Sequence, residues 1–259
     1  MGKIESLIKF TGRVDNVVGA KGKNGEIIIR KYQNNPTKSQ TTKQVEQRTR
    51  FLTATGLANL LTDRGIAGFT KYAKSEGISL ANAFVKANLT KQWMDNNMWS
   101  PVIKATTADD TTSTTIAWAQ LELSRGGTPN VIAQTPHFDD PNTIGIVWDK
   151  ASPDAVIGAN DMLTFVIFAA NSNPTLPPVI VSVPANTSGY KTDVEVPADW
   201  SGQRVHILGF ETLFSSEEEA VEYISIFNST IVDAVARRRE LQSSANYSRT
   251  LYMGTGLVA

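Results

Sequence analysis

The sequence predicts a mainly β protein with a helical N-terminal part (α+β), in which an extended arm or hairpin and several helices precede an immunoglobulin-like antiparallel sandwich. Three observations support this fold class. Short apolar segments with a period of two follow Pro101, apolar residues with helical spacing precede it, and the first fifty residues are basic and broken by glycine. We therefore expect three parts: a basic arm and β-hairpin at 1–40, a helical neck at 41–100, and a β-sandwich at 101–259 with one inserted helix at about 215–242.

Length and composition fit a soluble globular protein with a sizeable core. The chain has 259 residues, of which 41% are hydrophobic and 19% charged. It contains no cysteine, which excludes disulfides, thiolate nucleophiles and cysteine-ligated zinc. The opening MGKIESLIKF lacks the apolar stretch of a secretory signal, and the apolar run at 163–170 is too short to span a membrane.

The charges are distributed unevenly along the chain. Residues 1–50 hold eleven Lys or Arg and four Asp or Glu, a net charge of +7. The whole chain has 25 of each sign, so residues 51–259 carry −7. A basic segment joined to an acidic body is typical of a segment that binds another molecule.

The arm is expected to contain two short strands within 10–32, joined by a turn at Asn24-Gly25. Pro36 then favours an extended exit. An isolated hairpin of two strands is marginally stable in water, so this hairpin is expected to need a surface on which to pack.

Helical spacing predicts three helices, which begin at about Thr41, at Ile66 and at Ser79. The second is expected to end at Lys74 and the third at Trp93, with Ser79 as the N-cap of the third. Six apolar residues of the first helix fall near one face: Val45, Phe51, Leu52, Leu57, Leu60 and Leu61.

Strands are predicted where apolar or β-branched residues follow a period of two between turn clusters: 114–123, 143–148, 162–169, 179–183, 192–196 and 204–212. Residues 215–242 then favour one helix, with acids near its start and three arginines near its end. Its apolar stripe is Val221, Ile224, Phe227, Ile231 and Val235. Residues 245–259 are expected to form a strand or an extended tail.

The run FTGRVDNVVG at 10–19 resembles the start of an uncharacterised domain family common in Bacteroidota and their phages. So do Ile29-Arg30, Pro36-Thr37 and the QVEQRTRF run at 44–51, in the family's order and spacing. The likeness continues at 79–84 and 119–126, while Asp15 replaces the family's usual glycine. The resemblance implies a β-sandwich behind an N-terminal arm and no known activity. The arm also looks like those of proteins encoded among phage structural genes.

No catalytic, cofactor or metal motif stands out. The two histidines, His137 and His206, are 69 positions apart and are expected to be an ordinary turn residue and an ordinary strand residue. Four carboxylates have the oxygen chemistry that calcium prefers but do not follow EF-hand spacing: Asp139, Asp140, Asp149 and Asp161. The Asp139-Asp140-Pro141-Asn142 run is expected to be a turn in which the aspartates bond local backbone. Phosphate-binding loops, nucleophile elbows and zinc-protease motifs are absent from the sequence. We expect no catalytic residue, no cofactor and no small-molecule substrate.

The basic segment is the main candidate site. Its cations could contact a neighbouring subunit or the phosphates of a nucleic acid, or form a solvated face, and we favour the subunit. The candidates are Arg13, Lys21, Lys23, Arg30, Lys31, Lys38, Lys43, Arg48 and Arg50.

The tryptophans offer a second set of candidates. Trp93 and Trp99 mark the junction between helices and sheet and could fill an interdomain core or anchor an interface. Trp118, Trp148 and Trp200 could stack on sugars, but Trp118 and Trp148 lie in predicted strands and are expected to fill the sandwich. The three arginines at 237–239 could bind an anion, although the helix end already explains them.

We expect a non-enzymatic structural protein, a capsid, decoration or neck component of a phage virion assembled in the bacterial host cytoplasm. Its partners would be further copies of itself or other virion proteins, with no role at a membrane. Two alternatives stay open: a nucleic-acid-associated protein that uses the same arm, and a sandwich module that binds carbohydrate or a cell surface.

Overall fold

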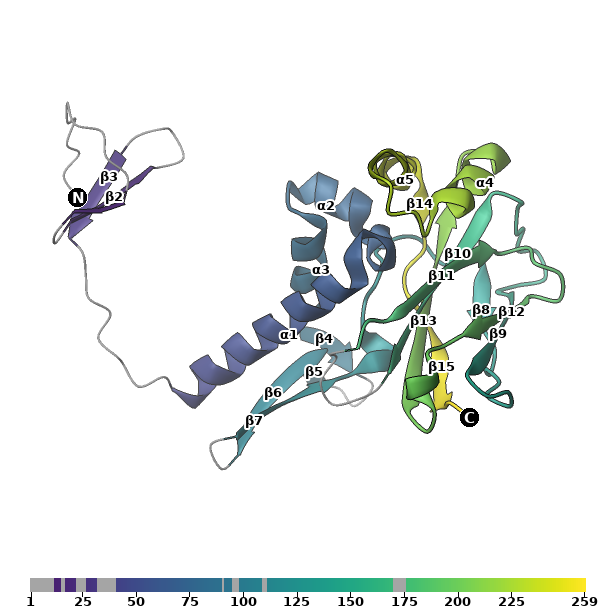
Figure 1. Ribbon diagram of the computed structural model, residues 1–259, viewed down its shortest axis with the longest axis horizontal. Coiled ribbons are helices and arrows are strands. Elements are labelled where there is room, and N and C mark those ends of the chain that lie inside the picture. Colours follow the sequence, from purple (N-terminus) through teal and green to yellow (C-terminus); the bar gives the residue numbers. More distant parts are fainter. Residues whose placement is uncertain are drawn as a thin grey trace. The chain divides into compact units, whose positions relative to one another are not determined.

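The computed structural model describes residues 12–14, 17–21, 27–31, 41–89, 91–94, 98–108, 111–169 and 176–259 (Figure 1). The chain forms two compact units, at 1–41 and 42–259. It is mainly β, with helices before a strand-rich region, so the predicted fold class is confirmed.

The first unit contains an antiparallel sheet with the strand order β1-β2-β3: Gly12–Val14, Val17–Lys21 and Ile27–Lys31. It has three strands where two were expected, because residues 12–14 pair with residues 17–19. The predicted hairpin corresponds to β2 and β3. Its turn at Asn24-Gly25, Asp15 and the exit at Pro36 lie outside the described residues.

Three helices open the second unit: α1, α2 and α3 at Thr42–Gly65, Thr70–Glu76 and Leu80–Leu89, with a short 3₁₀ turn before α2. The Oγ of Ser79 accepts a hydrogen bond from the backbone N–H of Asn82 at 3.2 Å, which confirms the predicted N-cap. The third helix was wrongly extended to Trp93. The chain instead enters a hairpin of β4 and β5, Lys91–Met94 and Met98–Pro101.

The remaining strands form three antiparallel groups. One hairpin pairs β6 with β7, Ile103–Ala108 and Thr111–Ile116. A three-stranded sheet, in the order β12-β9-β8, consists of Lys191–Glu195, Thr143–Lys150 and Val131–Ala133. A five-stranded sheet has the order β11-β10-β13-β14, with β15 also on β13: Val179–Pro184, Asp161–Ala169, Arg204–Leu213, Asn246–Tyr247 and Leu251–Leu257.

Two predicted elements differ in extent. The strand expected at 114–123 ends at Ile116, and a 3₁₀ turn at Trp118–Gln120 follows, because only residues up to Ile116 pair with β6. The single helix expected at 215–242 is two helices, α4 at Glu217–Ile226 and α5 at Val232–Ser244. They form a helical connection between β13 and β14.

Both faces of the five-stranded sheet are covered. On one face, Leu163, Phe165 and Ile167 of β10 belong to a core shared with the three-stranded sheet. On the other face, Val166 and Phe168 belong to a second core that includes α1, α3 and α4. Helices, five-stranded sheet and three-stranded sheet therefore form successive layers, and the expected neck and the expected sandwich contribute to one core (Figure 1).

Replacing Phe165 by alanine should lower the free energy of unfolding by about 3–5 kcal/mol, because it opens a cavity between the two sheets. The ring is fully buried and lies 5.6 Å from that of Trp148. Chemical denaturation would measure the loss. V156A is the matched control, since Val156 is 79% exposed and should change stability little. Equal effects of the two substitutions would contradict this layer arrangement.

Candidate functional site

The predicted basic residues lie on several elements. Arg30 and Lys31 end β3 and are exposed, and Lys43 and Arg48 are exposed on α1. Arg13 and Lys21 lie in β1 and β2, whereas Lys23 and Lys38 lie outside the described residues.

Arg50 has an internal role. Its Nε donates to the carbonyl oxygen of Ile103 at 2.8 Å, and its Nη2 donates to that of Leu89 at 3.0 Å. Nearby, Glu46 Oε1 accepts a hydrogen bond from the backbone N–H of Thr107 at 3.1 Å. These bonds attach the first half of α1 to β6 and to the end of α3, so the guanidinium of Arg50 is already engaged within the chain.

The first half of α1 presents an apolar pair to solvent. Phe51 is 52% exposed and Leu52 is 69% exposed, although both belong to the apolar side of the helix that the spacing predicted. The buried stripe of α1 begins at Ala54 instead. We call Arg48, Phe51 and Leu52 the α1 surface. Sequence spacing identified the apolar residues but not the point along the helix at which its covering partner ends.

The predicted apolar stripe of the C-terminal helices is also largely exposed. Val221 is 62% exposed and Ile224 is 37% exposed, while Ala220 and Tyr223 of the same helix are buried. Two acids near the start of α4 are exposed, which completes what we call the α4 surface: Glu217, Glu218, Val221 and Ile224. Ile231 and Val232, which lead into α5, are exposed as well.

The three arginines of α5 are engaged in ion pairs. Arg237 pairs with Glu222 and Glu240, each at 2.8 Å. Arg239 pairs with Asp63 at 2.9 Å. Arg238 is buried; it faces Asp63 at 3.4 Å and donates to the carbonyl oxygen of Phe227 at 2.9 Å. The flanking arginines therefore hold the pKa of Asp63 below its usual value despite burial, and this cluster joins α5 to α1.

The tryptophans occupy different environments. Trp148 is buried between the two sheets, as predicted, and its Nε1 donates to the carbonyl oxygen of Ala185 at 2.9 Å; Trp200 is buried in the same core. Trp118 is half-buried and lies outside a strand. Trp93 and Trp99 face each other in the register of β4 and β5. An interface role for this pair stays a prediction.

The two histidines lie in different surroundings, His206 among aromatic rings and His137 at the surface. Trp118 stacks on His206 with 5.1 Å between ring centres, and Tyr252 Oη lies 3.0 Å from His206 Nδ1. Burial, together with Arg204, lowers the pKa of His206 to about 4. His137 is exposed and bridges Gly145 through its backbone. Within the described ranges, no group of three or more histidine, aspartate or glutamate residues could hold a metal ion.

Two carboxylates are buried in the five-stranded sheet, Glu211 on β13 and Asp161 on β10. Glu211 is 1% exposed, and its Oε2 accepts a hydrogen bond from the N–H of Asn130 at 2.8 Å. Burial, with a smaller contribution from the nearby Asp161, raises the pKa of Glu211 to about 7. Asp161 Oδ2 accepts a bond from the N–H of Gly158 at 2.7 Å, and burial raises its pKa too. Both carboxylates hold backbone segments in place.

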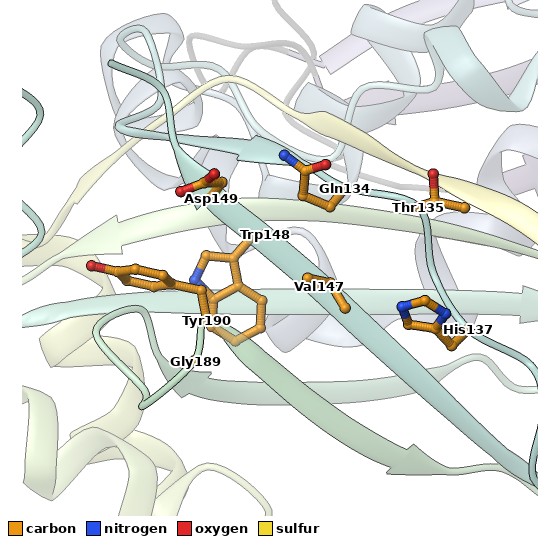
Figure 2. Close-up of a pocket in the computed structure, with 8 residues that line it drawn as sticks. All are labelled: Gln134, Thr135, His137, Val147, Trp148, Asp149, Gly189 and Tyr190. Atoms are coloured by element: carbon orange, nitrogen blue, oxygen red, sulfur yellow. The ribbon is translucent and has the colours of Figure 1, made fainter. Parts of the chain in front are cut away.

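A shallow pocket of about 490 Å³ lies beside β9. Figure 2 shows Tyr190 and Asp149 toward one end and Thr135 and His137 toward the other. Tyr190 has a φ of 48°, which is unusual for a bulky residue and follows a turn in which its N–H donates to the carbonyl oxygen of Thr187 at 2.9 Å. Sequence analysis did not predict this pocket, because its residues come from separate segments and match no motif.

A family model described as a family of unknown function (DUF6266) matches residues 9–226. No curated protein and no solved structure matches the chain. Of the helices in the described part of the chain, none is long and apolar enough to cross a membrane.

Replacing Glu211 by glutamine should remove a pH dependence from stability. The folded pKa of about 7 exceeds the ordinary 4.5, so the folded state binds more protons between these values and the wild-type free energy of unfolding falls as pH rises through that window. The variant should match the wild type near pH 4.5 and exceed it by on the order of 2 kcal/mol above pH 7.

Denaturation of both proteins at several pH values would measure this difference. The contribution of His206 has the opposite sign between about pH 4 and 6.5, but it is common to both proteins and cancels. A constant difference across the range would show that Glu211 titrates normally.

Proposed function

We propose a function for this chain on the basis of its own charges and contacts, because it belongs to the DUF6266 family of unknown function. It is a non-enzymatic structural protein that assembles with copies of itself through its basic N-terminal segment. Assembly would bring the basic segment of one copy against the acidic body of the next.

The observation that carries this proposal is that the two compact units of the chain have opposite net charges. Residues 1–41 form a compact unit and hold eight Lys or Arg against three Asp or Glu, a net charge of +5. Residues 42–259 hold seventeen against twenty-two, a net charge of −5. Opposite charges on separate units favour association between copies, and they steer its rate and orientation more than they add affinity.

We further propose a phage virion as the setting, in a capsid, decoration or neck position. The resemblance of the arm to those of phage structural proteins supports this setting. A sheet of three short strands has little core of its own, and it would gain stability by packing on a neighbouring copy.

Deleting residues 1–40 should leave a folded body and abolish self-association. The deletion keeps Thr41, so α1 begins as in the full chain. Light-scattering mass of both proteins at low and high salt would measure the change, and circular dichroism would check the fold. Oligomers of the full chain should weaken in high salt, because exposed charge pairs are screened. An undiminished mass after deletion would refute an assembly role for the arm.

The same exposed cations would suit the phosphates of a nucleic acid, and the two proteins distinguish this alternative. A full chain that stays monomeric yet shifts duplex or single-stranded DNA in a gel at low salt, with the shift lost on deletion, would favour nucleic acid.

The pocket in Figure 2 supports a second candidate function, the binding of a neutral saccharide. An aromatic ring beside carboxylate, amide and hydroxyl groups suits a ligand with both apolar and hydroxyl faces. The strained backbone at Tyr190 is the specific observation, because such strain gathers at binding sites.

On a glycan array, Y190A should lose roughly tenfold in affinity for any bound saccharide, since its ring supplies the stacking surface. The matched control Y190F keeps the ring and should bind nearly as well. Equal binding by wild type and Y190A, or no bound glycan, would exclude this pocket.

A further inference from the structure

We infer that the α1 surface of one copy docks on the α4 surface of a second copy, in a head-to-tail contact. This inference rests on the proposed self-assembly and names the surfaces that would make it. The partner is a second copy of this chain because each surface offers the chemistry that the other lacks.

The α1 surface is basic and apolar. Arg48 precedes Phe51 and Leu52 by three and four residues, so the three side chains lie on one side of the helix. All three are exposed, with Leu52 at 69%. Arg50 holds this part of the helix against β6 and the end of α3 through two hydrogen bonds to backbone carbonyls. The surface is therefore presented by a fixed element.

The α4 surface is acidic and apolar. Glu217 precedes Val221 by four residues and Ile224 by seven, which again places them on one side of the helix. Glu222 of the same helix pairs with Arg237, and Glu219 accepts a bond from the N–H of Ser215. Among the described residues, neither Glu217 nor Glu218 has an ion-pair partner. Glu218 accepts hydrogen bonds from its own backbone N–H and the Ser216 hydroxyl, but both acids are exposed and can meet a cation from another molecule.

The two surfaces match in spacing. In each helix the charged residue precedes its first apolar partner on that side by one turn, Arg48 before Leu52 and Glu217 before Val221. Two such helices packed in the same direction place the arginine opposite the acids and the aliphatic side chains opposite each other. Antiparallel packing would place charge against apolar surface, so the pattern also fixes the orientation.

One copy cannot make this contact with itself. The end of α1 that reaches the C-terminal helices is at Asp63, which pairs with α5. The α1 surface ends at Leu52, eleven residues before Asp63 and roughly 17 Å from it along the helix axis. Figure 1 shows the first half of α1 projecting away from α4 and α5. The contact is therefore heterologous, and it would propagate into a ring or a filament.

Two surface variants of the full chain test the contact by mixing. One carries F51S and L52S, and the other carries V221S and I224S. Each should weaken self-association at least tenfold and give monomers under conditions in which the wild type is oligomeric. An equimolar mixture should form a heterodimer of twice the monomer mass and no larger species, because each variant retains the surface that the other has lost. V156S is the control, since Val156 is exposed on neither surface.

Charge reversal tests the pairing of residues. R48E should dissociate the oligomer, and E217R with E218R in the same chain should restore it. K74E is the matched control, because Lys74 is an exposed base on α2. Thermal melts would confirm that every variant is folded.

Variants that keep the wild-type mass, a mixture that stays monomeric, or a wild type that is itself monomeric would overturn the inference. A failure of the arm proposal alone would give a different result. The protein without residues 1–40 would still form the oligomer, while the surface variants would still dissociate it.

Discussion

Strand β10 must be covered on both faces, and the rest of the second unit depends on this constraint. All nine of its residues are buried. Leu163 and Phe165 require a second sheet on one side, and Val166 and Phe168 require helices on the other. The fit is close: a side-chain carbon at Gly209 of the paired strand would lie 3.0 Å from the ring of Phe165. A sandwich alone would leave one face of this strand in water, so the helices are part of the core.

This requirement explains why α1 is exposed where it is. Its second half, from Ala54 onward, covers the sheet, while its first half extends beside the β6–β7 hairpin. Arg50 and Glu46 bond to that hairpin, so the projecting turns are held by polar contacts and do not bury Phe51 or Leu52. An exposed aromatic and aliphatic pair on a fixed helix costs solubility, and it makes physical sense when another molecule covers it.

Sequence periodicity predicted the strands of the central sheet well, because β10 and β13 are long and apolar and turn residues bound them. It also predicted the cap at Ser79, a local interaction. It placed Phe51 and Val221 in apolar stripes but did not predict their exposure, because a period identifies a stripe and not whether the fold supplies a partner for it. The pocket at Tyr190 was not predicted for a related reason. Its residues on β9 and in the turn at Gly189-Tyr190 are far apart in the sequence and are brought together only by the fold.

The three acids at the start of α4 differ in how the fold uses them. Ser216 Oγ accepts a bond from the N–H of Glu219, and Glu219 in turn accepts from the N–H of Ser215, so one acid completes the cap. Glu217 and Glu218 add favourable charge at the helix N-terminus, but they make no ion pair within the described chain. Val221, one turn later, is likewise beyond what the core requires, since Ala220 and Tyr223 fill it. The proposed contact between copies would use these exposed acids and Val221, and it would set them against the cation and the apolar pair on α1.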